Sequence, residues 1–200
     1  MDFTLLKITA LLSLIPASVL TFRRTPQKDM VFWSAVAVAL FGRIVWVYIR
    51  QSAGWHTGLS TALWLTVASC LIVYVVIALF PDDGWRLTAI LFPYLLILGI
   101  LAVVWSQVPE QPFVGNAPLA WIGTHIAVSV ATYAMITLAA VAALAATLQE
   151  RAIKSKKRTR VSQLLPSVAG SEGLLVRLLI ASEVVLAIGL ITGMATLYMT

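Results

Sequence analysis

Four polar side chains at the start of an apolar run form the most chemically suggestive pattern in the sequence. They are His125, Ser129, Thr132 and Tyr133, and their spacing predicts that they share one face of an α-helix. A neutral imidazole in such a stripe can ligate haem iron or a metal, or can hydrogen-bond to a neighbouring membrane helix. From the residues alone the interhelical hydrogen bond is favoured, because polar side chains commonly join membrane helices.

His56 is the only other histidine, and it lies just before an apolar run, between Trp55 and Thr57. The distribution of basic residues described below puts it on the same side of a membrane as His125, which a shared ligand would require. An exposed loop histidine beside an interfacial tryptophan is the more ordinary interpretation. Ligation of one cofactor by His56 and His125 stays open as the alternative.

Two ionisable residues, Arg43 and Glu183, lie inside apolar runs. A charged group within the bilayer is costly, so each is a functional hypothesis by default. Arg43 is two turns from the end of its run and can extend to the outer headgroups, whereas Glu183 is too far from either end to do so easily. An intramembrane Arg43–Glu183 pair is one solution, and protonation of Glu183 is the other.

Several kinds of catalytic site are missing from the sequence. It contains no Ser/His/Asp set, no H-E-x-x-H, no P-loop and no paired carboxylates. The single cysteine, Cys70, excludes C-x-x-C redox chemistry and covalent haem attachment to this chain. We therefore predict that the protein is not an enzyme.

The composition is that of a membrane protein. Hydrophobic residues make up 60% of the chain and charged residues 11%, which is too little charge to cover a soluble globule of this size. The net charge of +6 does not indicate a nucleic-acid partner, since six of the 14 basic residues fall between Arg151 and Arg160. In an apolar chain such a cluster is typical of a cytoplasmic loop that binds anionic lipid headgroups.

Apolar runs predict an all-α, polytopic transmembrane helix bundle, which forms a single integral membrane domain over residues 1–200. Every backbone polar group must be paired inside lipid, so the spans are helices. Pro16 and Pro93 predict kinks or local unwinding within two of them. The six expected spans lie near residues 4–22, 30–49, 59–80, 87–105, 121–148 and 174–196.

The fifth run exceeds one bilayer thickness, so its helix should tilt or project beyond the membrane surface. A basic cytoplasmic loop is expected at residues 149–171. Ser171 and Glu172 are the expected N-cap and first-turn acid of the last span.

The basic residues also predict the orientation, because loops rich in lysine and arginine stay in the cytoplasm. Eleven basic residues fall on one side and two, Lys7 and Arg50, on the other. Both chain ends should therefore lie outside, on the periplasmic side of a bacterial inner membrane. The eleven are Arg23, Arg24, Lys28, Arg86, Arg151, Lys154, Lys156, Lys157, Arg158, Arg160 and Arg177.

Residues 121–193 resemble the cytochrome c assembly protein family, which includes CcsA, CcmC and HemX-like membrane proteins. The pattern H-(x3)-S-(x3)-Y-A begins at His125 and resembles the start of a helix in that family. It is followed by a long alanine-rich helix, a basic loop, Leu165–Pro166–Ser167, residues 172–177 and residues 189–193. The tryptophan-rich segment of the haem-delivering members is missing, so the chain is most similar to the HemX-like branch, shortened or incomplete at its C-terminus.

This resemblance implies a role in cytochrome c maturation or haem handling, with haem as the cofactor and His125 as an outer-side ligand. It also implies other cytochrome c assembly proteins as partners beside the lipid bilayer. The alternative is a non-catalytic structural or accessory subunit of a membrane complex that binds no cofactor. A small-solute transporter is a third interpretation, suggested only by Pro16, Pro93 and Glu183.

Overall fold

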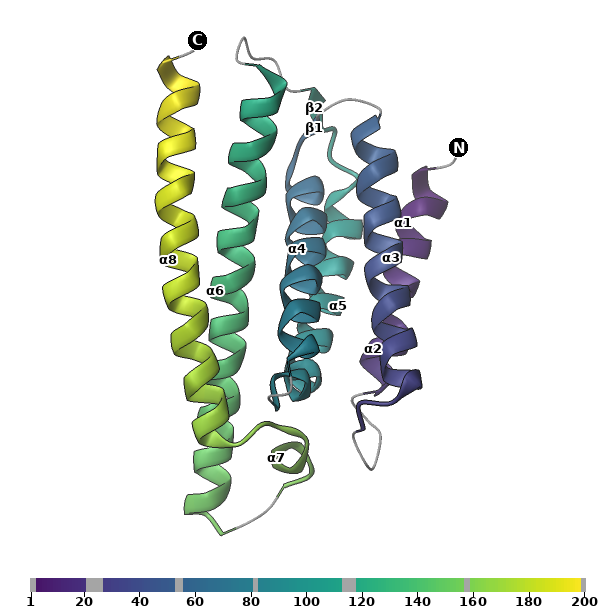
Figure 1. The fold of residues 1–200 in the computed structure, drawn as a ribbon. Coiled ribbons are helices and arrows are strands. Elements are labelled where there is room, and N and C mark those ends of the chain that lie inside the picture. Colours follow the sequence, from purple (N-terminus) through teal and green to yellow (C-terminus); the bar gives the residue numbers. More distant parts are fainter. Residues whose placement is uncertain are drawn as a thin grey trace.

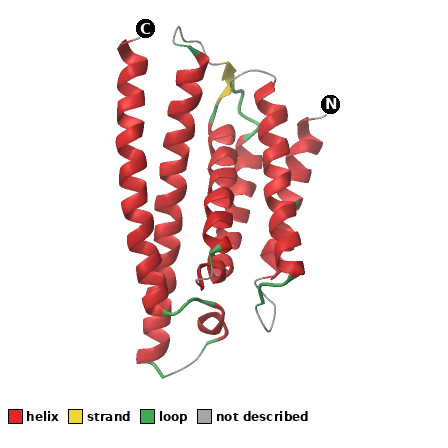
Figure 2. Cartoon of the chain, in the orientation of Figure 1, coloured by secondary structure: helices red, strands yellow, loops and turns green. Residues whose placement is uncertain are grey.

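The computed structural model of the chain describes residues 3–20, 27–52, 56–80, 83–112, 118–156 and 159–198. Within these ranges the protein is a bundle of helices, and the only strands are a two-residue antiparallel pair in which His56 lies opposite Pro112 (Figures 1 and 2). The elements are α1 (Phe3–Leu12), α2 (Ile15–Leu20), α3 (Met30–Ser52), β1 (His56–Thr57), α4 (Leu59–Leu79), η1 (Asp83–Leu87), α5 (Thr88–Trp105), β2 (Gln111–Pro112), α6 (Leu119–Lys154), α7 (Arg160–Leu164) and α8 (Val168–Tyr198).

Helix α1 begins and α8 finishes at the same end of the bundle, which is called the upper end, as in Figure 1. Helix α6 and strand β1 also begin there, whereas α7 lies at the opposite, lower end (Figure 1). Within the described ranges five helical segments are long and apolar enough to cross a membrane. These lie at Met30–Arg50, Leu59–Leu79, Asp83–Trp105, Ala120–Lys154 and Val168–Ala195.

The expected first span, residues 4–22, is not one continuous helix, because the described part of this segment is broken into α1 and α2. The break falls just before Pro16, which has no N–H to donate to the carbonyl of Leu12. Within the described residues the apolar helical stretch is Lys7–Leu20, which is shorter than the five segments above. The local unwinding expected at Pro16 is therefore present. At Pro93 it is not, since α5 continues through that residue.

Helix α6 is longer than the predicted span and reaches Lys154. At about 1.5 Å per residue, its 36 residues extend about 54 Å, against a hydrocarbon core about 30 Å thick. Its length exceeds one bilayer, so projection beyond the membrane surface, or a tilt across it, stays a prediction.

The expected bounds of the basic loop, residues 149–171, differ from the structure, because α6 continues to Lys154 and α8 begins at Val168. Ser171 is buried inside α8 and does not cap it. The preceding serine has this role, since the backbone N–H of Gly170 donates to the Ser167 hydroxyl at 3.1 Å. Ser167 and Ser171 are one helical turn apart, and either could cap a helix as far as the sequence shows. Packing of the helix decided between them.

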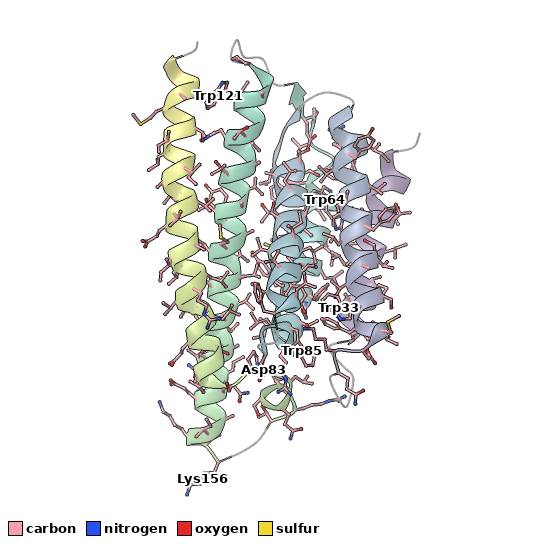
Figure 3. All side chains as sticks on the ribbon, in the orientation of Figure 1. Trp33, Trp64, Asp83, Trp85, Trp121 and Lys156 are labelled. Atoms are coloured by element: carbon pink, nitrogen blue, oxygen red, sulfur yellow. The ribbon has the colours of Figure 1, made fainter. Side chains whose placement is uncertain are left out.

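Helices α4 and α5 lie in the middle of the main hydrophobic core, which α3 and the lower half of α6 complete. A second, smaller core near the upper end consists of Ala10, Trp46, Trp64 and Ala102. Helix α8 runs along α6, its main neighbour, and contributes only Leu178 to the buried residues of the main core (Figures 1 and 3). Much of the apolar surface of α8 is consequently exposed.

Candidate functional site

His125 lies near the upper end of α6 and joins this helix to α8. Its Nδ1 atom is 3.2 Å from the carbonyl oxygen of Gly189 and 3.3 Å from the hydroxyl oxygen of Thr192. Because a carbonyl oxygen only accepts, the bond to Gly189 requires the proton on Nδ1. The Nε2 atom then keeps its lone pair, and it has no hydrogen-bond partner among the described residues.

Gly193 allows this close approach of the imidazole. A Cβ atom on Gly193 would lie 2.9 Å from Cε1 of His125, nearer than carbon atoms approach in proteins. The seam between α6 and α8 is thus shaped around the imidazole, with Gly189, Thr192 and Gly193 on the α8 side. The predicted interhelical hydrogen bond of His125 is present.

The rest of the predicted polar stripe does not stay on one inward face. The Ser129 and Thr132 hydroxyls donate to carbonyls of their own helix, at His125 and Val128. Thr132 is buried, but Tyr133 is 63% exposed. Successive helical residues are turned by about 100°, so neighbours such as Thr132 and Tyr133 cannot share a narrow stripe. Tyr133 therefore lies at the edge of the predicted stripe and faces outward.

The backbone of His56 lies at the upper end in β1, the end at which α6 begins (Figure 1). Both histidines therefore belong to the same end of the bundle. The side chain of His56 is outside the described residues, so its shared ligation with His125 stays a prediction.

Arg43 and Glu183 do not form the intramembrane pair that was considered. Arg43 is fully buried, and its Nη2 atom donates to the carbonyl of Ala10 in α1. Glu183 is exposed on α8. No ion pair among the described residues joins the two. Arg43 also does not extend to the headgroups, because α1 and α4 cover it.

Trp64 of α4 is the neighbour of Arg43 that sequence reasoning missed. The guanidinium carbon lies 4.3 Å from the centroid of the Trp64 ring, a cation–π contact. The Nε and Nη1 atoms of Arg43 and the Nε1 atom of Trp64 are all buried without a hydrogen-bond partner in the described part of the chain. An arginine inside an apolar run indicates that some neighbouring group must stabilise its charge. The sequence does not identify which of the seven tryptophans lies beside it.

A pocket of about 310 Å³ lies above this cluster, at the upper end of the bundle. The side chains that line it include Lys7, Trp46, Arg50, Ser60, Thr61 and Glu110. Arg50 forms an ion pair with Glu110, and the Thr61 N–H and hydroxyl also donate to that carboxylate, at 3.1 and 2.9 Å. This network ties the loop after α5 to α3 and α4. Two isolated charges, Arg50 at a helix end and Glu110 among prolines, were its only signal in the sequence.

The pKa of Glu110 reflects two opposing effects. Burial alone raises the pKa of this carboxyl, but the hydrogen bonds from Arg50 and Thr61 and the charge of Arg50 lower it more. The net result is a pKa below the ordinary value of 4.5. Glu110 is therefore ionised at neutral pH.

An apolar groove of about 900 Å³ lies between α3, α4 and the upper half of α6. Ile44, Leu65, Ile72, Ile126 and Val130 are among its lining residues. His125 is not among them, because it points to α8 on another side of α6. Across the described ranges, no group of three or more His, Cys, Asp or Glu side chains is placed to hold a metal ion.

The amino-acid sequence is similar to that of a protein from Azospirillum brasilense, which is described as an uncharacterized 28.8 kDa protein in the nifR3-like 5′ region. The two sequences are 45% identical over 196 residues, covering 96% of this chain and 72% of the relative. No family model and no solved structure matches the chain. The extent of this similarity shows that the chain belongs to the same family as the Azospirillum brasilense 28.8 kDa protein.

Proposed function

We propose that this protein acts in cytochrome c maturation or haem handling, as an integral protein of the bacterial inner membrane that offers His125 as a ligand to haem iron. The observation that supports this proposal is the state of the His125 imidazole. Its Nδ1–H is held by the Gly189 carbonyl, so Nε2 keeps its lone pair and a fixed direction. Histidines that bind metals almost always donate their other ring N–H in this way.

The surroundings fit a haem ligand of this kind. His125 is half-buried at the seam of two apolar helices, where exposed surface of α8 is available to a flat apolar molecule. Bound haem would supply the iron centre, and the chain would supply one axial nitrogen and its orientation. The second axial ligand would come from His56 or from a partner protein of the same assembly machinery.

Absorption spectra of the purified protein test the proposal, with two variants that separate ligation from packing. His125→Ala removes both the ligand and the hydrogen bond. His125→Asn keeps an N–H that can donate to Gly189, but it is a poor ligand for iron. We expect a Soret band in the parent and its loss in both variants, whereas only His125→Ala should lose the interhelical bond, worth about 0.6 to 1.7 kcal/mol.

Ser129→Ala is the matched control, because this hydroxyl bonds only to its own helix. Haem-free protein from haem-replete cells, with His125→Ala equal to the parent in cytochrome c maturation, would contradict the proposal.

The second candidate is a structural or accessory subunit without a cofactor, and the exposed face of α8 favours it. Only a small share of the Val168–Ala195 span is buried, and Glu183 is exposed within it. Carboxyls inside membranes usually meet a polar partner in a protein interior. This function predicts that Glu183→Leu abolishes assembly into a larger complex without altering any absorption spectrum.

The orientation belongs to the same proposal, with both chain ends on the periplasmic side. The described basic residues of α6 and α7, among them Arg151, Lys154 and Arg160, lie at the lower end (Figure 1). We propose that the stretch Arg151–Arg160 binds anionic lipid headgroups there, at about 1 kcal/mol for each basic residue near the surface. Vesicles with and without phosphatidylserine would measure this binding, and neutralising four of the charges should weaken it while any haem spectrum stays unchanged.

A further inference from the structure

We propose that the upper end of the bundle contains a binding site for a small anion, either a carboxylate or an inorganic anion of a few heavy atoms. Its deepest donors are the Arg43 guanidinium and the Trp64 indole N–H, and its mouth is the 310 Å³ pocket lined by Lys7 and Arg50. This site is separate from His125 and does not depend on haem binding.

The first argument is the set of unpaired donors. Nε of arginine carries one N–H and Nη1 carries two, and tryptophan Nε1 carries one more. In Arg43 and Trp64 all of these atoms are buried and without a partner in the described ranges. Burying unpaired polar groups is costly, and burying a charge without a counter-charge is more so. The cation–π contact of Arg43 with Trp64 offsets only part of that cost.

The second argument is the position of the pocket, which lies one helical turn above these donors and is lined by Trp46 but not by Arg43 or Trp64 themselves. On each of the four elements around the cluster, a pocket residue stands three or four positions from a cluster residue, which is one helical turn. These pairs are Lys7 and Ala10, Trp46 and Arg43, Ser60 and Trp64, and Ser106 and Ala102. Trp46 lies between the two levels, since it lines the pocket and packs against Trp64 with ring centroids 5.5 Å apart.

The third argument is the chemistry of the lining. Arginine and tryptophan side chains only donate hydrogen bonds, so the ligand must accept them. Glu110 balances the charge of Arg50 through their ion pair, so among the described residues at this end Lys7 and Arg43 are an excess of positive charge. A volume of about 310 Å³ suits a small solute. A small anion satisfies all three requirements, and it would enter from the upper end, past Trp46.

The test uses [14C]formate as the probe and the full-length protein purified in an uncharged detergent, at neutral pH and constant ionic strength. The parent should bind formate saturably, with chloride and phosphate tested as competitors to identify the preferred anion. We expect Arg43→Gln to weaken binding by at least about tenfold, since a buried charged hydrogen bond is lost. Trp64→Phe keeps the ring but removes one N–H, and it should weaken binding by a smaller factor. Lys28→Gln, two residues before α3, should bind like the parent.

A second measurement tests the proposal even if Arg43→Gln does not fold. The thermal unfolding midpoint of the parent should rise with formate concentration, because a ligand that binds only the folded state stabilises it. Arg43→Lys, which retains the charge but loses the guanidinium, should show a smaller rise. The proposal is overturned if the parent binds no formate, chloride or phosphate saturably, which would mean that only water meets these donors. It is equally overturned if Arg43→Lys and Trp64→Phe bind like the parent.

Discussion

The backbone of Gly193 in α8 lies directly against the imidazole of His125 in α6. An added Cβ atom at position 193 would stand 2.9 Å from Cε1 and 3.4 Å from Nδ1 of His125. The hydrogen bond from His125 to Gly189 therefore depends on the missing side chain one turn further along α8. This contact fixes how closely α6 and α8 approach at the upper end.

Gly193→Ala should consequently separate the two helices or push the imidazole away from Gly189. Overpacking of this kind costs about 1 to 3 kcal/mol. Gly173→Ala is the matched control on the same helix, because its Cβ would meet nothing within 4 Å. Unfolding in detergent, followed by circular dichroism, would compare the two. Equal stability of the two variants would show that α6 and α8 are not tightly packed at His125.

Gln149 should hold the short helix α7 against the lower end of α6. Its Nε2 atom lies 2.7 Å from the carbonyl oxygen of Ser162, 3.0 Å from that of Pro166 and 3.2 Å from that of Leu165. In Gln149→Ala these backbone groups lose their donor, so trypsin should cleave after Arg160 faster than in the parent. Gln163→Ala removes an exposed amide of α7 itself and should not change the cleavage rate.

The Glu110 network should make stability depend on pH in the acidic range. The pKa of Glu110 is lowered in the folded protein, so its contribution is fully present above the unfolded value of about 4.5. It is lost as the pH falls from there through the folded pKa. Glu110→Gln should therefore be less stable than the parent at pH 7, by about 1 to 3 kcal/mol. Unfolding midpoints between about pH 3 and 7 should converge at the acidic end. Parallel curves would mean that the carboxylate charge is not involved.

Thiol labelling should reveal the orientation of the chain in the membrane. The native Cys70 is buried, so it should not react with the label. Ser155 at the lower end and Gln107 at the upper end are not buried. If the basic lower end is cytoplasmic, an impermeant maleimide added to intact cells should label Gln107→Cys but not Ser155→Cys. Both should react after the membrane is permeabilised. The reverse pattern in intact cells would invert the proposed topology.

The sequence determined that the chain forms helices long and apolar enough to cross a membrane, because apolar runs of bilayer length can pair their backbone groups in lipid only as helices. The boundaries of α4 and α5 followed from the sequence within a residue or so, since polar loops flank these runs. The break before Pro16 was also foreseeable, because the missing N–H is a local property.

Only the tertiary structure decided which polar side chains meet. The periodicity of α6 marked one face, but packing against the neighbouring helices buries Thr132 and leaves Tyr133 exposed. The partner of His125 is a backbone carbonyl, which every residue has, so no side-chain pattern identifies Gly189. Arg43 was recognisable as anomalous, yet its neighbours Ala10 and Trp64 come from two other helices. Their approach depends on how the helices pack around the upper core, and this is a property of the whole bundle.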